Sequence, residues 1–132
     1  MPVAYELDTR RKLLLVRGTG LVTAPELMEV QRALRDREDL DREWRALLDL
    51  SSVEDLAGSS EDISSITALS NARRLARVAV VAARDAAYGL ARVYQARVAH
   101  GEIAVFRKRE EALEWLGMPD PDDASSHPLP TG

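Results

Sequence analysis

The sequence contains no cysteine, only one phenylalanine, two tryptophans and three tyrosines, and no long apolar run. Without cysteine, a disulfide framework, a thiolate zinc site and a cysteine nucleophile are all excluded. No run approaches the roughly 20 apolar residues that span a bilayer, and the N-terminus lacks the pattern of a signal peptide. These absences predict a cytoplasmic protein with no membrane span.

Positive charge is not in excess: 18 Lys and Arg residues oppose 22 Asp and Glu residues, for a formal net charge of -4. Phosphate backbones are bound by a dominant basic face, so nucleic acid is not the expected partner. His100 and His127 lack a carboxylate or nucleophile at a recognisable spacing, and no phosphate-loop, zinc-protease or nucleophile-elbow motif occurs. We therefore expect no enzyme activity and no cofactor.

Carboxylates cluster around two segments, at Asp49, Glu54 and Asp55 and then at Glu61 and Asp62. Their oxygens are ligands that a divalent cation accepts. Glu61 and Asp62 fall in the first turn of a predicted helix, where negative charge complements the helix dipole. This simpler explanation is preferred, and no metal site is predicted.

The order of periodic segments predicts one α/β domain, strand-strand-helix and then three strand-helix pairs (ββαβαβαβα). The predicted strands are residues 3–8, 12–17, 44–50, 78–83 and 103–106, and the predicted helices are residues 24–39, 61–74, 85–99 and 108–116. Gly18 to Gly20 end the second strand in this prediction. Residues 118–132, which hold four of the six prolines, form a tail outside the domain of residues 1–117.

Strands that alternate with helices predict a mixed, mostly parallel sheet, with sequence-adjacent strands side by side and the first strand antiparallel at one edge. In the strand of residues 78–83, Val78 and Val80 point to one face, while Ala79 and Val81 point to the other. Both faces must therefore be covered, either by helices on two sides or by a second copy in a homodimer.

A partner or ligand edge is predicted where strands end and helices begin. The strand of residues 44–50 supplies Asp49 at this edge, and the loop of residues 51–60 supplies Ser51 and Gly58. The helix from Asp85 supplies Tyr88, Gly89 and Arg92. Glycine early in a helix suggests close approach of a backbone or a ligand at Gly89. Arg92 either receives an anionic group or pairs with Asp85 or Asp49.

Ser59 and Ser60 precede the helix of residues 61–74 and are candidate phosphoacceptors. A phosphate there would meet the positive end of the helix dipole and free backbone donors. Simple capping of the helix by either hydroxyl is the more common arrangement.

The chain resembles the SpoIIAA-like STAS/SEC14 family of small bacterial domains. The resemblance is carried by the element order and by four segments, residues 47–53 (LLDLSSV), 77–82 (RVAVVA) with 88–92 (YGLAR), 105–107 (VFR) and 111–116 (EALEWL). It implies a SpoIIAA-like (STAS-type) β/α superhelix, sometimes dimeric, whose better-known members act without catalysis as phosphorylation switches that bind proteins. Ser59 falls at the family's phosphoacceptor position, while Ala57 and Ser60 stand where the pattern has aspartate and glycine.

Two functions follow as hypotheses. The first is a non-enzymatic regulatory or protein-interaction module of STAS type, switched by serine phosphorylation. The second, implied by the SEC14-like side of the resemblance, is a carrier or sensor of a small apolar or anionic ligand. A pocket lined by Ile63, Ile66, Tyr88 and Leu90, with Arg92 at its mouth, would favour the ligand, and a flat edge with exposed Ser59 would favour a protein partner.

Overall fold

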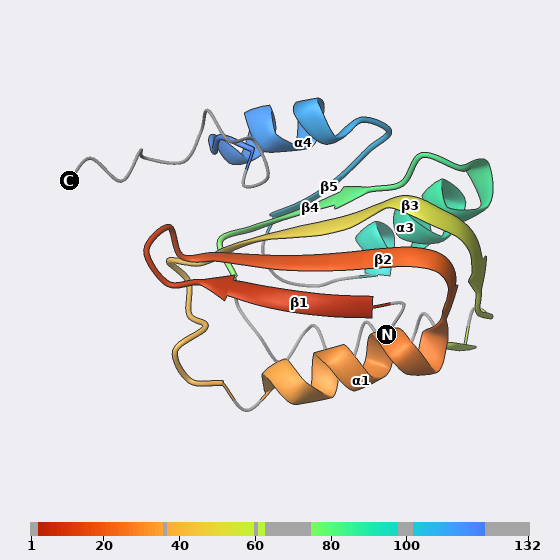
Figure 1. Ribbon diagram of the computed structural model, residues 1–132, viewed down its shortest axis with the longest axis horizontal. Coiled ribbons are helices and arrows are strands. Elements are labelled where there is room, and N and C mark those ends of the chain that lie inside the picture. The colour runs from red at the N-terminus through yellow and green to blue at the C-terminus, as the bar shows by residue number, and fades with distance from the viewer. Residues whose placement is uncertain (1–2, 36, 60, 63–74, 98–101, 121–132) are drawn as a thin grey trace.

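The computed structural model describes residues 3–35, 37–59, 61–62, 75–97 and 102–120. Its helices and strands are, in chain order, β1 (Val3–Asp8), β2 (Leu13–Thr23), α1 (Ala24–Arg35), β3 (Arg45–Ala57), β4 (Arg77–Val81), α3 (Asp85–Arg97), β5 (Glu102–Phe106) and α4 (Arg109–Leu116). Together they make the α/β domain that the sequence predicts (Figure 1).

The five strands form one sheet in the order β1-β2-β3-β4-β5. β1 runs antiparallel to β2, and every other neighbouring pair is parallel. The predicted arrangement, with adjacent strands side by side and the first strand antiparallel at an edge, is confirmed.

Both faces of the sheet are covered by helices of the same chain (Figure 1). Val78 and Val80 of β4 belong to the apolar cluster that includes residues of α1 and α3. Ala79 and Val81 belong to the opposite cluster, which is closed by α4. The alternation predicted in β4 is confirmed. Of the two kinds of cover that the sequence left open, helices of the same chain lie on both faces of the sheet.

Two strands are longer than predicted. β2 continues through the glycines to Thr23, and β3 continues to Ala57, because their second halves pair with each other from Thr19 opposite Ser52 to Thr23 opposite Ala57. The predicted end of β2 at Gly18 to Gly20 and the predicted loop from Ser51 are therefore wrong. Only Gly58 and Ser59 lie between β3 and the start of the next helical turn in the described chain.

Gly18 and Gly20 shape this extended pair rather than ending it. A Cβ built on Gly18 would lie 3.0 Å from Cγ2 of Val53 and 3.1 Å from Cδ2 of Leu50. Gly20 has a φ of 64°, and the register between β2 and β3 shifts on either side of these residues. The glycines thus allow close approach and a bulge in a continuous strand.

The start of α1 is predicted correctly, but its end is not. Thr23 and Glu26 form the expected capping box, in which the Thr23 N–H and hydroxyl donate to Glu26 Oε1 at 3.0 and 2.8 Å. α1 ends at Arg35 rather than residue 39, because the following charged run offers no apolar stripe and Leu40 turns back into the core. Gly117, with a φ of 71°, ends α4 as predicted.

Parts of several predicted segments lie outside the described residues. Glu61 and Asp62 are helical, and the rest of the predicted helix to residue 74 lies outside the described residues. The same holds for residues 98–99 of the predicted third helix and for residues 121–132 of the tail. Met118 packs against the apolar cluster beneath α4.

Candidate functional site

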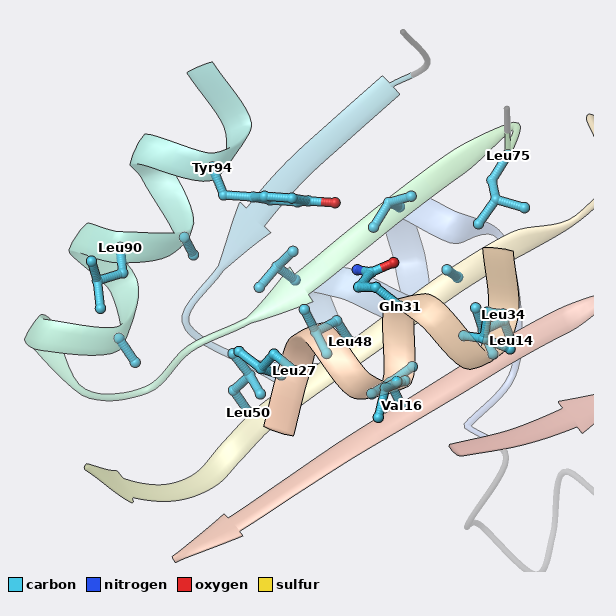
Figure 2. Close-up of a pocket in the computed structure, with 16 residues that line it drawn as sticks. Leu14, Val16, Leu27, Gln31, Leu34, Leu48, Leu50, Leu75, Leu90 and Tyr94 are labelled. Carbon is cyan, nitrogen blue, oxygen red and sulfur yellow. The ribbon is translucent and has the colours of Figure 1, made fainter. Parts of the chain in front are cut away.

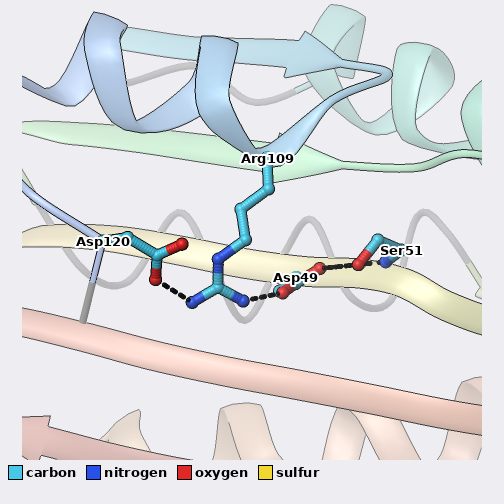
Figure 3. A network of polar contacts seen from close by, with 4 residues as sticks. All are labelled: Asp49, Ser51, Arg109 and Asp120. Carbon is cyan, nitrogen blue, oxygen red and sulfur yellow. Dashed lines mark hydrogen bonds and ion pairs between the residues drawn. The ribbon is translucent and has the colours of Figure 1, made fainter. Parts of the chain in front are cut away.

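Asp49, predicted as an edge residue, is buried in β3 with 7% of its surface exposed. Its Oδ1 accepts hydrogen bonds from the backbone N–H of Ser51 at 3.0 Å and from the Ser51 hydroxyl at 2.6 Å. Its Oδ2 pairs with the Arg109 guanidinium, which also donates to Asp120 at 2.9 Å (Figure 3). Both carboxylate oxygens are thus engaged within the protein, and the network ties the start of α4 to the sheet.

The arginines that pair with carboxylates at this edge are Arg107 and Arg109 rather than the predicted Arg92. Asp49 pairs with Arg109, and Asp85 pairs with Arg107 at 2.7 Å, so the proposed pairing of Arg92 with either carboxylate is not found in the described chain. Sequence reasoning missed Arg107 and Arg109. Arg107 follows β5 directly, and Arg109 begins α4 just after it. The carboxyl ends of parallel strands meet at one edge of a sheet, and this is the signal that could have found both arginines.

Ser59 is exposed and caps the helical turn that begins at Glu61. The Asp62 N–H donates to Ser59 Oγ at 3.2 Å, while the Ser59 N–H and hydroxyl donate to Asp62 Oδ2 at 2.9 and 3.1 Å. This is a reciprocal capping arrangement. Gly58 lies beside it, where an added Cβ would be 3.5 Å from Cβ of Ala24, and Ser60 lies outside the described residues.

The predicted edge residues Tyr88, Gly89 and Arg92 all lie on α3. The Arg107 guanidinium lies over the Tyr88 ring, 4.0 Å from its centroid. A Cβ on Gly89 would meet no atom of the described residues within 4 Å, so no described backbone approaches it closely, and the approach of a ligand stays a prediction. Arg92 is exposed on α3. The contacts of the described residues divide the predicted site among separate clusters.

The structure instead shows a pocket that the sequence did not place correctly. It lies between α1, α3 and the sheet, is partly open to solvent and has a cavity volume of about 90 Å³. The floor comes from β2, β3 and β4, and the described walls include Leu27 and Leu34 of α1 and Leu90 and Ala91 of α3 (Figure 2). Nearly all of the described lining is apolar.

One amide interrupts this apolar lining. Gln31 extends from α1 into the space between the two helices, and Tyr94 extends toward that space from α3 (Figure 2). The Gln31 Oε1 is buried and has no hydrogen-bond partner among the residues that the structure describes. Sequence reasoning missed Gln31, although it lies one helical turn after Leu27 on the inward stripe, where a polar residue is unusual.

The expected pocket lining is matched only at Leu90. Ile63 and Ile66 lie outside the described residues, while Tyr88 and Arg92 are absent from the described lining. Among the described residues, no group of three or more His, Cys, Asp or Glu side chains could hold a metal ion. No helix in the described part of the chain is long and apolar enough to cross a membrane.

These features define a small α/β domain with a mostly parallel sheet, helices on both faces and an apolar pocket under two of them. The sequence pattern of the SpoIIAA-like family matches residues 13–117, and the chain belongs to this family. A search of curated proteins finds no match.

The solved structures that share the fold include the following two. One is an uncharacterised protein with a SpoIIAA-like fold from Shewanella loihica PV-4, with 20% identity and a TM-score of 0.57 over 86% of this chain and 91% of that protein. The other is the anti-sigma factor antagonist SpoIIAA in its unphosphorylated form, with 10% identity and a TM-score of 0.51 over 87% and 97% of the two chains. At these identities the likeness shows the fold alone.

Proposed function

We propose that the protein is a non-enzymatic, STAS-type binding module that senses or carries a small apolar ligand in the pocket between α1 and α3. The pocket itself is the observation that carries this proposal. Its walls come from two helices and three strands, and its described lining is apolar apart from Gln31 and Tyr94. Concave apolar sites with a few polar groups are the usual form of a small-molecule site.

Toluene is a suitable probe because it is apolar, small and soluble enough for titration. Binding is followed by NMR, from the methyl resonances of the lining residues, such as Leu48, Leu90 and Ala91. In the wild type we expect these resonances to shift with toluene concentration, while methyls packed under α4 stay unchanged.

Two alanines on α3 provide a matched pair of variants. Ala91 lines the pocket and is 7% exposed, whereas Ala96 is exposed and lies outside the described lining. Ala91→Leu should occupy part of the cavity and weaken toluene binding about tenfold, and Ala96→Leu should leave it unchanged. Equal affinities in the two variants, or a wild type whose pocket resonances never move, would refute the proposal.

Native mass spectrometry of the protein from its own host complements this titration. A molecule retained under gentle conditions and lost on denaturation would give the mass of the natural ligand. Its absence in the pocket-filling Ala91→Leu variant, purified in parallel, would assign it to the pocket.

A second candidate function is a protein-interaction module switched at Ser59. It is supported by the exposed capping hydroxyl of Ser59 and, by analogy, by the anti-sigma factor antagonist that shares the fold. A phosphate on Ser59 would remove the proton donated to Asp62 and place negative charge beside that carboxylate, so the cap would break. Phosphopeptide mapping tests this candidate, and partner binding by Ser59→Ala that equals the wild type would remove Ser59 from it.

A further inference from the structure

The polarity of the pocket limits the chemical class of ligand that it can bind. The inference drawn from it rests on the proposed function. Gln31 holds a buried carbonyl oxygen at the edge of an apolar cavity, and no described residue donates a hydrogen bond to it. Burial of an unpaired polar atom costs free energy in the ligand-free protein. A ligand group that reaches this amide would relieve the cost, whereas a purely apolar ligand would leave it in place.

The charge of that group is limited by its surroundings. No Lys, Arg, Asp or Glu side chain is among the described lining residues. A charged group placed there would lose its hydration without a counter-charge from these residues, which is far more costly than burial of a neutral group. The matching group is therefore neutral.

The group must also suit an amide in either orientation. The oxygen and nitrogen of a glutamine side chain are exchanged by a rotation of its last torsion, so the ligand meets either an acceptor or a donor. A hydroxyl can donate and accept. We infer that the pocket binds a small apolar molecule that carries one neutral hydroxyl-type group, and that this group pairs with Gln31.

The size of the cavity agrees with a compact ligand or with one end of a longer one. An engineered apolar cavity of about 150 Å³ in another protein holds benzene. The cavity here is about 90 Å³ and partly open, so a ring or short chain enters in part while the remainder faces solvent.

Phenol and toluene test this inference because they differ by a hydroxyl in place of a methyl on the same ring. Each is titrated by NMR into the wild type, Gln31→Met and Gln95→Met. Methionine keeps the length and helix preference of glutamine. Gln95 also lies on a helix, but its amide donates to the Ile103 carbonyl at 2.8 Å and it lies outside the described lining, so it serves as the matched control.

The measured quantity is the ratio of the affinities for phenol and toluene. The two probes differ in hydration by the same amount in every titration, so this difference cancels when the ratio is compared between variants. We expect Gln31→Met to lower this ratio about fivefold, the net value of one hydrogen bond, and Gln95→Met to leave it unchanged. Gln31→Leu repeats the test if the methionine variant does not fold.

The outcomes separate the inference from the proposed function. If both probes bind and the ratio is the same in the wild type and Gln31→Met, the inference fails while the binding pocket stands. If neither probe moves the pocket resonances, the proposed function fails, and the inference fails with it.

Discussion

The contact between Asp49 and Arg109 leads to the sharpest prediction about stability. Asp49 lies in β3 and Arg109 begins α4, so this ion pair joins the helix to the sheet across the apolar cluster beneath it. Asp49→Asn tests the pair with almost no change of volume. The asparagine oxygen can still accept from Ser51, but its NH₂ group would face the guanidinium, donor against donor.

The size of the effect follows from the burial of the two partners. Removal of one partner from a fully buried ion pair costs about 3 to 5 kcal/mol. Here 8% of the Asp49 side chain and 18% of the Arg109 side chain are exposed, and Arg109 keeps Asp120 as a second partner. We therefore expect Asp49→Asn to lower the free energy of unfolding by about 2 to 3 kcal/mol, which leaves the domain folded if its stability lies in the usual range of about 5 to 15 kcal/mol.

Urea denaturation followed by circular dichroism measures this change, with Glu102→Gln as the matched control. Glu102 pairs with Arg77 at 3.1 Å, but 63% of its side chain is exposed, so its loss should cost less than about 1 kcal/mol. Equal losses in the two variants would show that the buried pair contributes no more than a surface pair. In a double-mutant cycle, Asp49→Asn with Arg109→Met should lose at least about 1 kcal/mol less than the sum of the single variants.

Four further substitutions test the backbone, the cap and the pocket. Gly18→Ala should lower the free energy of unfolding by about 1 to 3 kcal/mol, because its Cβ would crowd β3. Gly89→Ala should raise the free energy of unfolding by about 0.5 to 1 kcal/mol, since the described residues leave space at this helical site. A similar loss of stability in both glycine variants would contradict this account. Thr23→Ala should cost about 1 kcal/mol, with Thr23→Ser close to the wild type. Gln31→Met should stabilise the ligand-free protein by about 1 kcal/mol, and a loss of stability in the same denaturation assay would show that the buried amide is satisfied.

The sequence predicted those features of the fold that depend on neighbouring residues. The capping box at Thr23, the stop at Gly117 and the alternation in β4 are all local signals, and each is confirmed. The second halves of β2 and β3 could not be predicted in this way. Their glycines, serines and carboxylates are typical of loops, and only their mutual pairing, between segments far apart in the chain, holds them as strands.

The candidate site was harder to predict for the same reason. Asp49 and Arg109 are separated by 60 positions, so neither residue alone indicates the pair. Asp49 and Ser51 were recognised as polar residues at a strand end, but the structure buries Asp49 in β3, where its Oδ1 accepts both hydrogen bonds from Ser51. Gln31, in contrast, could have been predicted from the sequence. It lies on the inward stripe of α1, and a polar residue at such a position is a signal of a candidate site.

The two faces of the sheet are built in different ways, and this separates stability from binding. Beneath α4 the buried carboxylate of Asp49 is paired with Arg109 and with the exposed Ser51, which is the arrangement expected of a buried polar group that contributes to stability. Beneath α1 and α3 the described residues leave a buried acceptor on Gln31 unpaired at a cavity, which costs stability unless a ligand satisfies it. If the pocket is a binding site, Asp49→Asn should lower stability and leave the ratio of phenol to toluene affinity unchanged. Gln31→Met should instead raise stability and lower that ratio.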